Sequence, residues 1–169
     1  MRRPRPTRER VSEIAGNDER ERTRAEHAGG IVIFGRIDHI GVAVEDLDAA
    51  IELYETSFGM ELGPRETVEE QGVEAALMNV GAGHVELMAA TGPDTPVGKF
   101  IAKRGAGMHH VAYATDDIDS TLEQLAASGI ELIDAKARIG IGGSRVAFLQ
   151  PRSTGRVLTE IVEPPEGGH

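Results

Sequence analysis

Residues 36 to 44 read Arg-Ile-Asp-His-Ile-Gly-Val-Ala-Val, and the rest of the chain is organised around this apolar run with one histidine in it. Bulky side chains at positions 40, 42 and 44 alternate with smaller or polar ones at 39, 41 and 43. A period of two is typical of a strand with two different faces. We expect the bulky face to pack beneath a helix, and the face that carries His39 to line a space.

A second copy of this pattern begins 71 residues later, where residues 107 to 114 read Gly-Met-His-His-Val-Ala-Tyr-Ala and His110 falls on His39. The same offset joins Asp46 to Asp117, which stand where the N-caps of the following helices are expected. Self-similarity at a fixed offset indicates a repeated supersecondary unit. The chain therefore predicts an α+β fold of two similar halves, each with one strand, one helix and three further strands.

Cap and turn residues delimit the other elements. The first helix is expected to end at Gly59, and strands interrupted by turns follow it up to residue 88. A connector helix joins the halves, because Thr95 can cap it and Pro96 suits its first position. In the second half we expect strands at 108–115, 130–133, 144–149 and 156–162 and a helix from about 118 to 127.

Residues 1 to 30 differ from the rest, because they mix both charges and lack apolar periodicity. We expect them to form a disordered N-terminal extension. One domain is expected from 36 to 165. It comprises unit one at about 36–91, the connector helix at about 95–105 and unit two at about 107–165.

The composition excludes several kinds of chemistry. None of the 169 residues is a cysteine, so disulfides and thiolate ligands are absent and any metal must be held by His, Asp or Glu. The formal net charge of −10 argues against a nucleic-acid binder, which needs clustered Lys and Arg. No run approaches the roughly 18 apolar residues of a membrane span, and the N-terminus lacks an apolar signal core. We expect a cytoplasmic protein that binds neither nucleic acid nor membrane.

The repeat also predicts a site. Late strands of the two halves align at an offset of 74, which sets Glu86 against Glu160. Equivalent residues of a repeat converge at its pseudo-twofold axis, so we expect His39, Glu86, His110 and Glu160 to meet. A single strand histidine is most often a hydrogen-bonded structural residue, but two imidazoles and two carboxylates at equivalent positions favour a metal. This donor set suits a divalent ion such as cobalt, nickel, manganese, iron or zinc.

Other polar residues are weaker candidates. Alternation puts His109 on the face opposite His110, in a structural role, and places His84 beside Glu86 in a supporting or exposed position. Residues 140 to 143 lack the spacing of a dinucleotide site and are expected to form a turn. Six basic side chains could contact the phosphates of an anionic ligand or simply carry surface charge: Lys99, Lys103, Arg104, Arg138, Arg145 and Arg152.

Four motifs carry a resemblance to a known family: Ile37-Asp38-His39-Ile40-Gly41, Glu70-Gln71-Gly72-Val73, the stretch from Asp94 to His110 and the stretch from Pro151 to Glu160. From about Arg36 to Pro164 the chain resembles the vicinal oxygen chelate, or glyoxalase-like, superfamily, and more narrowly its methylmalonyl-CoA epimerases. The resemblance implies that two βαβββ units form an open barrel around a metal. It also implies the same four ligands, His39, Glu86, His110 and Glu160.

The resemblance further implies an activity. An acyl-CoA thioester, methylmalonyl-CoA, would be epimerised between its (2R) and (2S) forms by proton abstraction at C2 through a metal-stabilised enolate. Glu160 would be both ligand and catalytic base on one face. Some members carry a second base four residues after the glutamine of Gln-Gly-Val, but Ala75 stands there. Glu74 is the substitute candidate, although a slip of one residue in a strand points a side chain to the other face.

Other activities remain open. A glyoxalase I type lyase (lactoylglutathione lyase) resembles the chain in fold and donor set, although the connector and the Pro-Arg-Ser-Thr-Gly ending favour the epimerase. A metal-free small-molecule binding module of the same fold would show no turnover. A ring-cleaving dioxygenase would leave one Glu unexplained, and Gln150 replaces a histidine usual in the epimerases. A homodimer is expected for such half-barrels.

Overall fold

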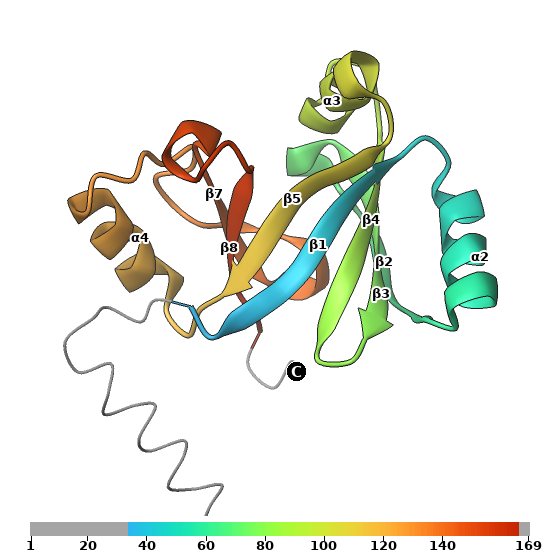
Figure 1. Ribbon diagram of the computed structural model, residues 1–169, viewed down its shortest axis with the longest axis horizontal. Coiled ribbons are helices and arrows are strands. Elements are labelled where there is room, and N and C mark those ends of the chain that lie inside the picture. The colour runs from blue at the N-terminus through green and yellow to red at the C-terminus, as the bar shows by residue number, and fades with distance from the viewer. Residues whose placement is uncertain (1–33, 166–169) are drawn as a thin grey trace, which may run out of the picture. The chain divides into compact units, whose positions relative to one another are not determined.

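The computed structural model describes residues 34 to 165. In this part of the chain one curled mixed sheet of eight strands carries three α-helices (Figure 1). The strands are β1 (Arg36–Val44), β2 (Glu61–Val68), β3 (Val73–Val80), β4 (Gly83–Ala90), β5 (Gly107–Ala114), β6 (Arg138–Ile139), β7 (Arg145–Leu149) and β8 (Thr159–Glu163). The helices are α2 (Leu47–Phe58), α3 (Pro96–Arg104) and α4 (Ile118–Ala127), with short 3-10 helices η1 (Glu69–Gln71), η2 (Ile141–Gly143) and η3 (Pro151–Ser153).

The strand order, β2-β3-β4-β1-β5-β8-β7-β6, shows the repeat in space. β1 pairs in parallel with β4, and β5 pairs in parallel with β8, so both halves have the same topology. The antiparallel contact between β1 and β5 joins the halves into one sheet. The predicted α+β fold of two βαβββ units is therefore confirmed, and its central four strands are those that carry the predicted ligands.

The helix boundaries follow from capping. The Asp46 carboxylate accepts a hydrogen bond from Ala49 N at 3.0 Å, and the Asp117 carboxylate accepts one from Ser120 N at 2.9 Å. Each bond satisfies an N–H that has no partner within its helix. Gly59 ends α2 in the left-handed conformation, with φ of 66°. The equivalent caps predicted at offset 71 therefore serve equivalent helices.

The bulky faces of the strands pack beneath the helices. Leu47 and Ile51 of α2 lie against Met78 and Leu87 of β3 and β4, and both of the latter are fully buried. Each such side chain contributes roughly 1.5–3 kcal/mol to folding. α4 packs in the same way on β7 and β8 (Figure 1). The small face of β1, with His39, Gly41 and Ala43 buried, is thus left for the interior of the curl.

Two strands of the second half differ from their predicted bounds. Residues 130 to 133 form no strand, because Ile133 N and Asp134 N both donate to the single carbonyl of Phe148, which breaks the ladder. The second strand of this half is instead the short β6. The last strand begins at Thr159 rather than at 156, since Gly155 and Arg156 have φ values of 69° and 71° and form a turn.

Residues 1 to 30, predicted to be disordered, lie outside the described residues, and the expected domain boundaries remain predictions. None of the helices between residues 34 and 165 is both long enough and apolar enough to cross a membrane.

Candidate metal centre

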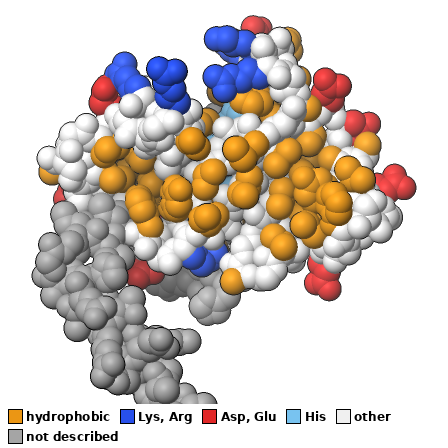
Figure 2. Space-filling view, viewed as in Figure 1, with side chains coloured by type: hydrophobic (Ala, Val, Ile, Leu, Met, Phe, Trp, Pro, Cys, Tyr) orange, Lys and Arg blue, Asp and Glu red, His pale blue; other side chains and the backbone are white. Residues whose placement is uncertain are grey.

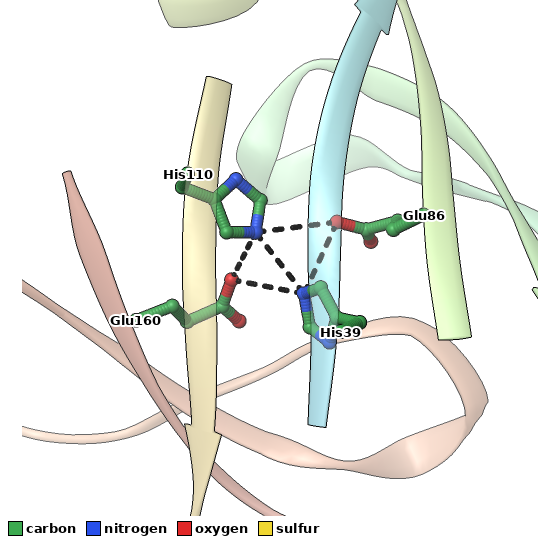
Figure 3. A group of neighbouring side chains, drawn as sticks. All are labelled: His39, Glu86, His110 and Glu160. Carbon is green, nitrogen blue, oxygen red and sulfur yellow. Dashed lines mark hydrogen bonds and ion pairs between the residues drawn. The ribbon is translucent and has the colours of Figure 1, made fainter. Parts of the chain in front are cut away.

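Four buried side chains meet on the inner face of the sheet (Figure 3). The Nε2 atoms of His39 and His110 lie 3.0 Å apart. Glu160 Oε2 lies 2.7 Å from His110 Nε2 and 3.4 Å from His39 Nε2, and Glu86 Oε2 lies 3.6 Å and 3.5 Å from the same two atoms. The structure therefore brings together all four residues that the repeat predicted, each from a different strand.

The register of the strands explains this convergence. Glu86 of β4 and His110 of β5 both stand opposite Gly41 of β1. In the mirrored arrangement, Ala112 of β5 stands opposite both His39 of β1 and Glu160 of β8. Gly41 and Ala112 are themselves 71 residues apart. In each half a small residue thus separates the two ligands that flank it, and leaves room for them above the sheet.

Gly41 is needed for a steric reason. A Cβ atom at this position would lie 2.1 Å from Cε1, 2.3 Å from Nδ1 and 2.7 Å from Nε2 of the His110 ring. The imidazole of His110 therefore lies directly over the backbone of β1. No larger residue fits without moving a predicted ligand.

The four donors fit a divalent metal ion. One ligand atom from each residue lies within 4.8 Å of all the others. An ion with bonds of about 2.0–2.2 Å holds opposite ligands up to about 4.4 Å apart, which is close to this spread. All four residues are at most 8% exposed, and two buried carboxylates facing one another need a cation between them. Imidazole nitrogen and carboxylate oxygen are ligands that borderline divalent ions accept.

Electrostatics of the metal-free cluster favour charge separation. Burial opposes the charge of His39, but hydrogen bonds to Asp38 and Glu160 prevail and raise its pKa to about 10. Burial also opposes the charge of Glu160, but its hydrogen bond with His110 prevails and lowers the pKa to about 2. Burial raises the pKa of Glu86. Near neutral pH a cationic His39 thus faces an anionic Glu160, and a metal would replace the proton of His39.

Both histidines have a neighbour that fixes the ring from behind. Asp38 Oδ1 lies 3.1 Å from His39 Nδ1, and His109 Nδ1 lies 3.0 Å from His110 Nδ1. Asp38 and His109 are equivalent in the repeat, and each coincides with a register shift in the pairing of β1 with β5. With Nδ1 occupied in this way, Nε2 of each histidine faces the other three donors.

The position of His109 corrects a prediction from strand alternation. His109 was expected on the face opposite His110, but a β-bulge lets two successive side chains share one face. Its ring packs on Phe100, with centroids 4.8 Å apart, and it lines a cavity beside the cluster. Burial and the neighbouring His110 lower its pKa to about 4, so it is neutral. Asp38 and His109 are also 71 residues apart, and this offset could have indicated that they occupy equivalent positions beside the two histidines.

Glu74 does not belong to this site, so its candidate role as second catalytic base is corrected. Its Oε1 accepts hydrogen bonds from Nε and Nη2 of Arg65 at 2.9 and 2.8 Å. Arg65 in turn pairs with Asp48 of α2, on the outer side of the sheet. Ala75, one residue on, is fully buried in an apolar cluster that faces the interior. Residues 73 to 76 of β3 pair with both neighbouring strands without a register shift, so strand alternation directs the side chain of Glu74 to the outer face.

His84 has no bond to any of the four predicted ligands. It stands opposite His39 in the register, and its Nδ1 is buried without a hydrogen-bond partner among residues 34 to 165. Together with Asp38 and Asn79 it lines a cavity of about 220 Å³. This agrees with a supporting place beside Glu86 rather than ligation.

The fold that carries this four-residue cluster is that of a known protein family. The family model described as the glyoxalase/bleomycin resistance protein/dioxygenase superfamily matches residues 38–148, and the chain belongs to this superfamily.

Within it, the similar proteins include methylmalonyl-CoA epimerases. The mitochondrial methylmalonyl-CoA epimerase of Bos taurus is 36% identical over 135 residues, which are 79% of this chain and 77% of that protein. The crystal structure of the Mycobacterium tuberculosis methylmalonyl-CoA epimerase matches with a TM-score of 0.78 and 37% identity over 83% of this chain and 95% of that one.

A variant of the Streptomyces coelicolor methylmalonyl-CoA epimerase in complex with 2-nitronate-propionyl-CoA matches with a TM-score of 0.76. It is 39% identical over 78% of this chain and 95% of that one. The resemblance found in the sequence motifs is therefore confirmed.

Proposed function

We propose that this protein is a metal-dependent enzyme that epimerises methylmalonyl-CoA between its (2R) and (2S) forms by moving a proton at C2. The observation that carries the proposal is the buried cluster of His39, Glu86, His110 and Glu160. It lies in a chain whose similar proteins include methylmalonyl-CoA epimerases at 36–39% identity. The substrate is thus an acyl-CoA thioester.

His39, Glu86, His110 and Glu160 would hold the divalent ion, for which cobalt, manganese, nickel and zinc are the candidates. When bound, the ion would supply Lewis-acid stabilisation of the negative charge that develops on the thioester oxygen. Asp38 and His109 keep the two imidazoles oriented through their Nδ1 atoms. Buried surroundings exclude water and strengthen every interaction with the developing charge.

Proton transfer at C2 needs one group on each face of the substrate. Glu160 is our candidate on one face, because it is buried beside both histidines and, as a ligand, would be kept anionic by the cation. On the other face Glu74 cannot act, because it points toward Arg65. The carboxyl-bearing residue Glu70 of η1 lines the cavity beside His109, so Glu70 replaces Glu74 as candidate for the second group.

A basic rim offers a place for the CoA phosphates. A pocket of about 490 Å³ lies between α3 and the segment that follows η3, with His109 and His110 in its wall. Figure 2 shows Lys and Arg side chains gathered at the end of the sheet where α3 lies. The basic residues of the pocket are Lys99, Lys103, Arg104 and Arg156. In an otherwise acidic chain, this local positive charge attracts an anionic substrate.

We also propose a homodimer and a cytoplasmic location. Val85, Ile40 and Val111 stand side by side in the register on the outer face of the central strands, and Ile40 is 37% exposed. Hydrophobic side chains spread over this face in Figure 2. A contiguous apolar surface of this kind is typical of an interface between copies. The cytoplasmic location rests on the sequence alone and stays a prediction.

Turnover of a single epimer tests the proposal. Purified full-length protein, loaded with cobalt, is incubated with (2S)-methylmalonyl-CoA, and the two epimers are separated by chiral chromatography. Conversion to an equal mixture supports the epimerase. If the protein instead converts the glutathione hemithioacetal of methylglyoxal to lactoylglutathione, it is a glyoxalase I type lyase. If it binds no metal and turns over neither substrate, only the binding module remains.

A further inference from the structure

Arg138 on β6 has an unpaired polar group inside the fold. Its Nε is buried and has no hydrogen-bond partner among residues 34 to 165, where the only other such side-chain atom is Nδ1 of His84. A guanidinium N–H is a strong donor, and leaving it buried without an acceptor is unfavourable. An acceptor is therefore expected in a functional state of the protein.

The side chain lines a cavity of about 190 Å³ that adjoins the metal centre. His109 and Phe148 form part of the same wall, and both pack against the ring of His110, with centroid distances of 5.3 and 5.4 Å. Most of the remaining lining is apolar, including Val73, Met88 and Val97. Arg138 is the one basic side chain among the lining residues, which also include Glu70, and its side chain is 31% exposed, so an anionic group of a ligand can reach it.

The guanidinium is held in place by contacts that leave Nε unused. Arg138 Nη2 donates to Asp134 Oδ2 at 3.0 Å, and the same carboxylate oxygen accepts from Phe148 N at 2.9 Å. Arg138 Cζ also lies 6.0 Å from the centroid of the Phe148 ring. The donor is thus oriented by its neighbours before any ligand arrives, which lowers the entropy cost of binding.

We propose that Arg138 binds the free carboxylate of the acyl group, and so selects thioesters of malonic acids over simple acyl-CoA thioesters. This inference rests on the proposed function, because it assigns one recognition contact within the same site. A carboxylate is planar and accepts charge-assisted hydrogen bonds from a guanidinium. The phosphates of CoA already have the basic rim of the other pocket, formed by Lys99, Lys103, Arg104 and Arg156.

The test compares two ligands that differ by the carboxylate. Binding of methylmalonyl-CoA and propionyl-CoA is measured by calorimetry on the full-length, cobalt-loaded protein and on Arg138→Met, which keeps length and apolar contact but removes the donor. We expect Arg138→Met to weaken methylmalonyl-CoA binding about tenfold or more and to change propionyl-CoA binding less than about twofold. Arg145→Met is the matched control, because Arg145 makes the same kind of bonds with Asp119 and Glu163 away from the cavity.

Each other result overturns the inference. Equal losses for both thioesters would mean that Arg138 contacts the CoA portion, and no loss for either would mean that the residue is structural. If Arg138→Met does not fold, Arg138→Gln decides, because it removes the charge but keeps a polar side chain: a loss confined to methylmalonyl-CoA supports the assignment, and unchanged binding contradicts it. If the wild-type protein binds neither thioester, the proposed function itself fails. If the wild-type protein binds methylmalonyl-CoA and the Arg138 variants still prefer it to propionyl-CoA as strongly, only the role of Arg138 fails.

Discussion

His39 and His110 share their environment but not their partners. His39 has a carboxylate behind its ring, and His110 has a neutral imidazole. A carboxylate behind a metal-binding histidine raises its basicity and fixes its orientation. The sequence identified both histidines through their offset, but not these partners, because strand alternation cannot reveal a bulge.

Asp38→Ala is expected to lower metal affinity about 10- to 100-fold while the protein remains folded, because His39 loses the group that orients its ring. Asp38→Asn should lose less, since its amide oxygen can still accept from Nδ1. Affinity is measured by competition with a chromophoric chelator. Asp48→Ala removes the same charge from an exposed site on α2 and serves as control. Wild-type affinity in Asp38→Ala would contradict the positioning role.

Residues of β3 show what the sequence could not decide. The glutamate nearest to the expected second base, Glu74, was a candidate because a bulge could have redirected it. Register shifts occur in the pairing of β1 with β5 and, between Leu62 and Arg65, in that of β2 with β3, but residues 73 to 76 of β3 pair regularly with both neighbouring strands. Position 75 is therefore occupied by an apolar side chain with no group that can carry a proton. Glu70 on η1 is the candidate for the second proton carrier instead.

At the scale of elements, the close approach of β5 to β1 depends on one missing side chain. Gly41→Ala would place a Cβ within 2.7 Å of three atoms of the His110 ring, so the imidazole must move. We expect metal content to fall at least about tenfold, and overpacking around the buried ring to lower the free energy of unfolding by about 1–3 kcal/mol without loss of the fold. Elemental analysis after dialysis measures the first and circular dichroism the second.

Gly92→Ala is the control for this prediction, since nothing lies within 4 Å of a Cβ there and its backbone needs no positive φ. A Gly41→Ala protein that retains a full complement of metal would show that the His110 ring is not required in its observed position.

Most elements were predictable because their signals are local. Asp46, Thr95 and Asp117 cap their helices as the sequence indicated, and the first half follows its expected strand plan. The strand predicted at residues 130 to 133 was wrong for a non-local reason. Its apolar residues suit a strand, but two successive N–H groups bond to one carbonyl of β7, so only a single bridge between Leu132 and Leu149 forms.

The outer face of the central strands is expected to form the dimer interface. Ile40→Arg places a charge in the middle of the row formed with Val85 and Val111, and should convert a dimer into a monomer. Sedimentation equilibrium measures this, since a chain of 18.1 kDa gives about 36 kDa (2 × 18.1) as a dimer. Val80→Arg, at the end of β3, is the control. A monomeric wild-type protein at micromolar concentration would contradict the proposal.

The repeat makes the molecule one catalytic unit: each half supplies one histidine and one glutamate, and neither half holds the complete cluster. We propose that this shared cluster holds the metal on which proton exchange at C2 depends. The most direct measurement follows deuterium entry at C2 of methylmalonyl-CoA in heavy water by mass spectrometry, for protein loaded with cobalt, stripped by a chelator and then reloaded. We expect rapid exchange, its loss by at least about 100-fold on stripping, and recovery on reloading, with Glu160→Ala inactive throughout. Exchange that is unaffected by chelation, or that persists in Glu160→Ala, would contradict this proposal.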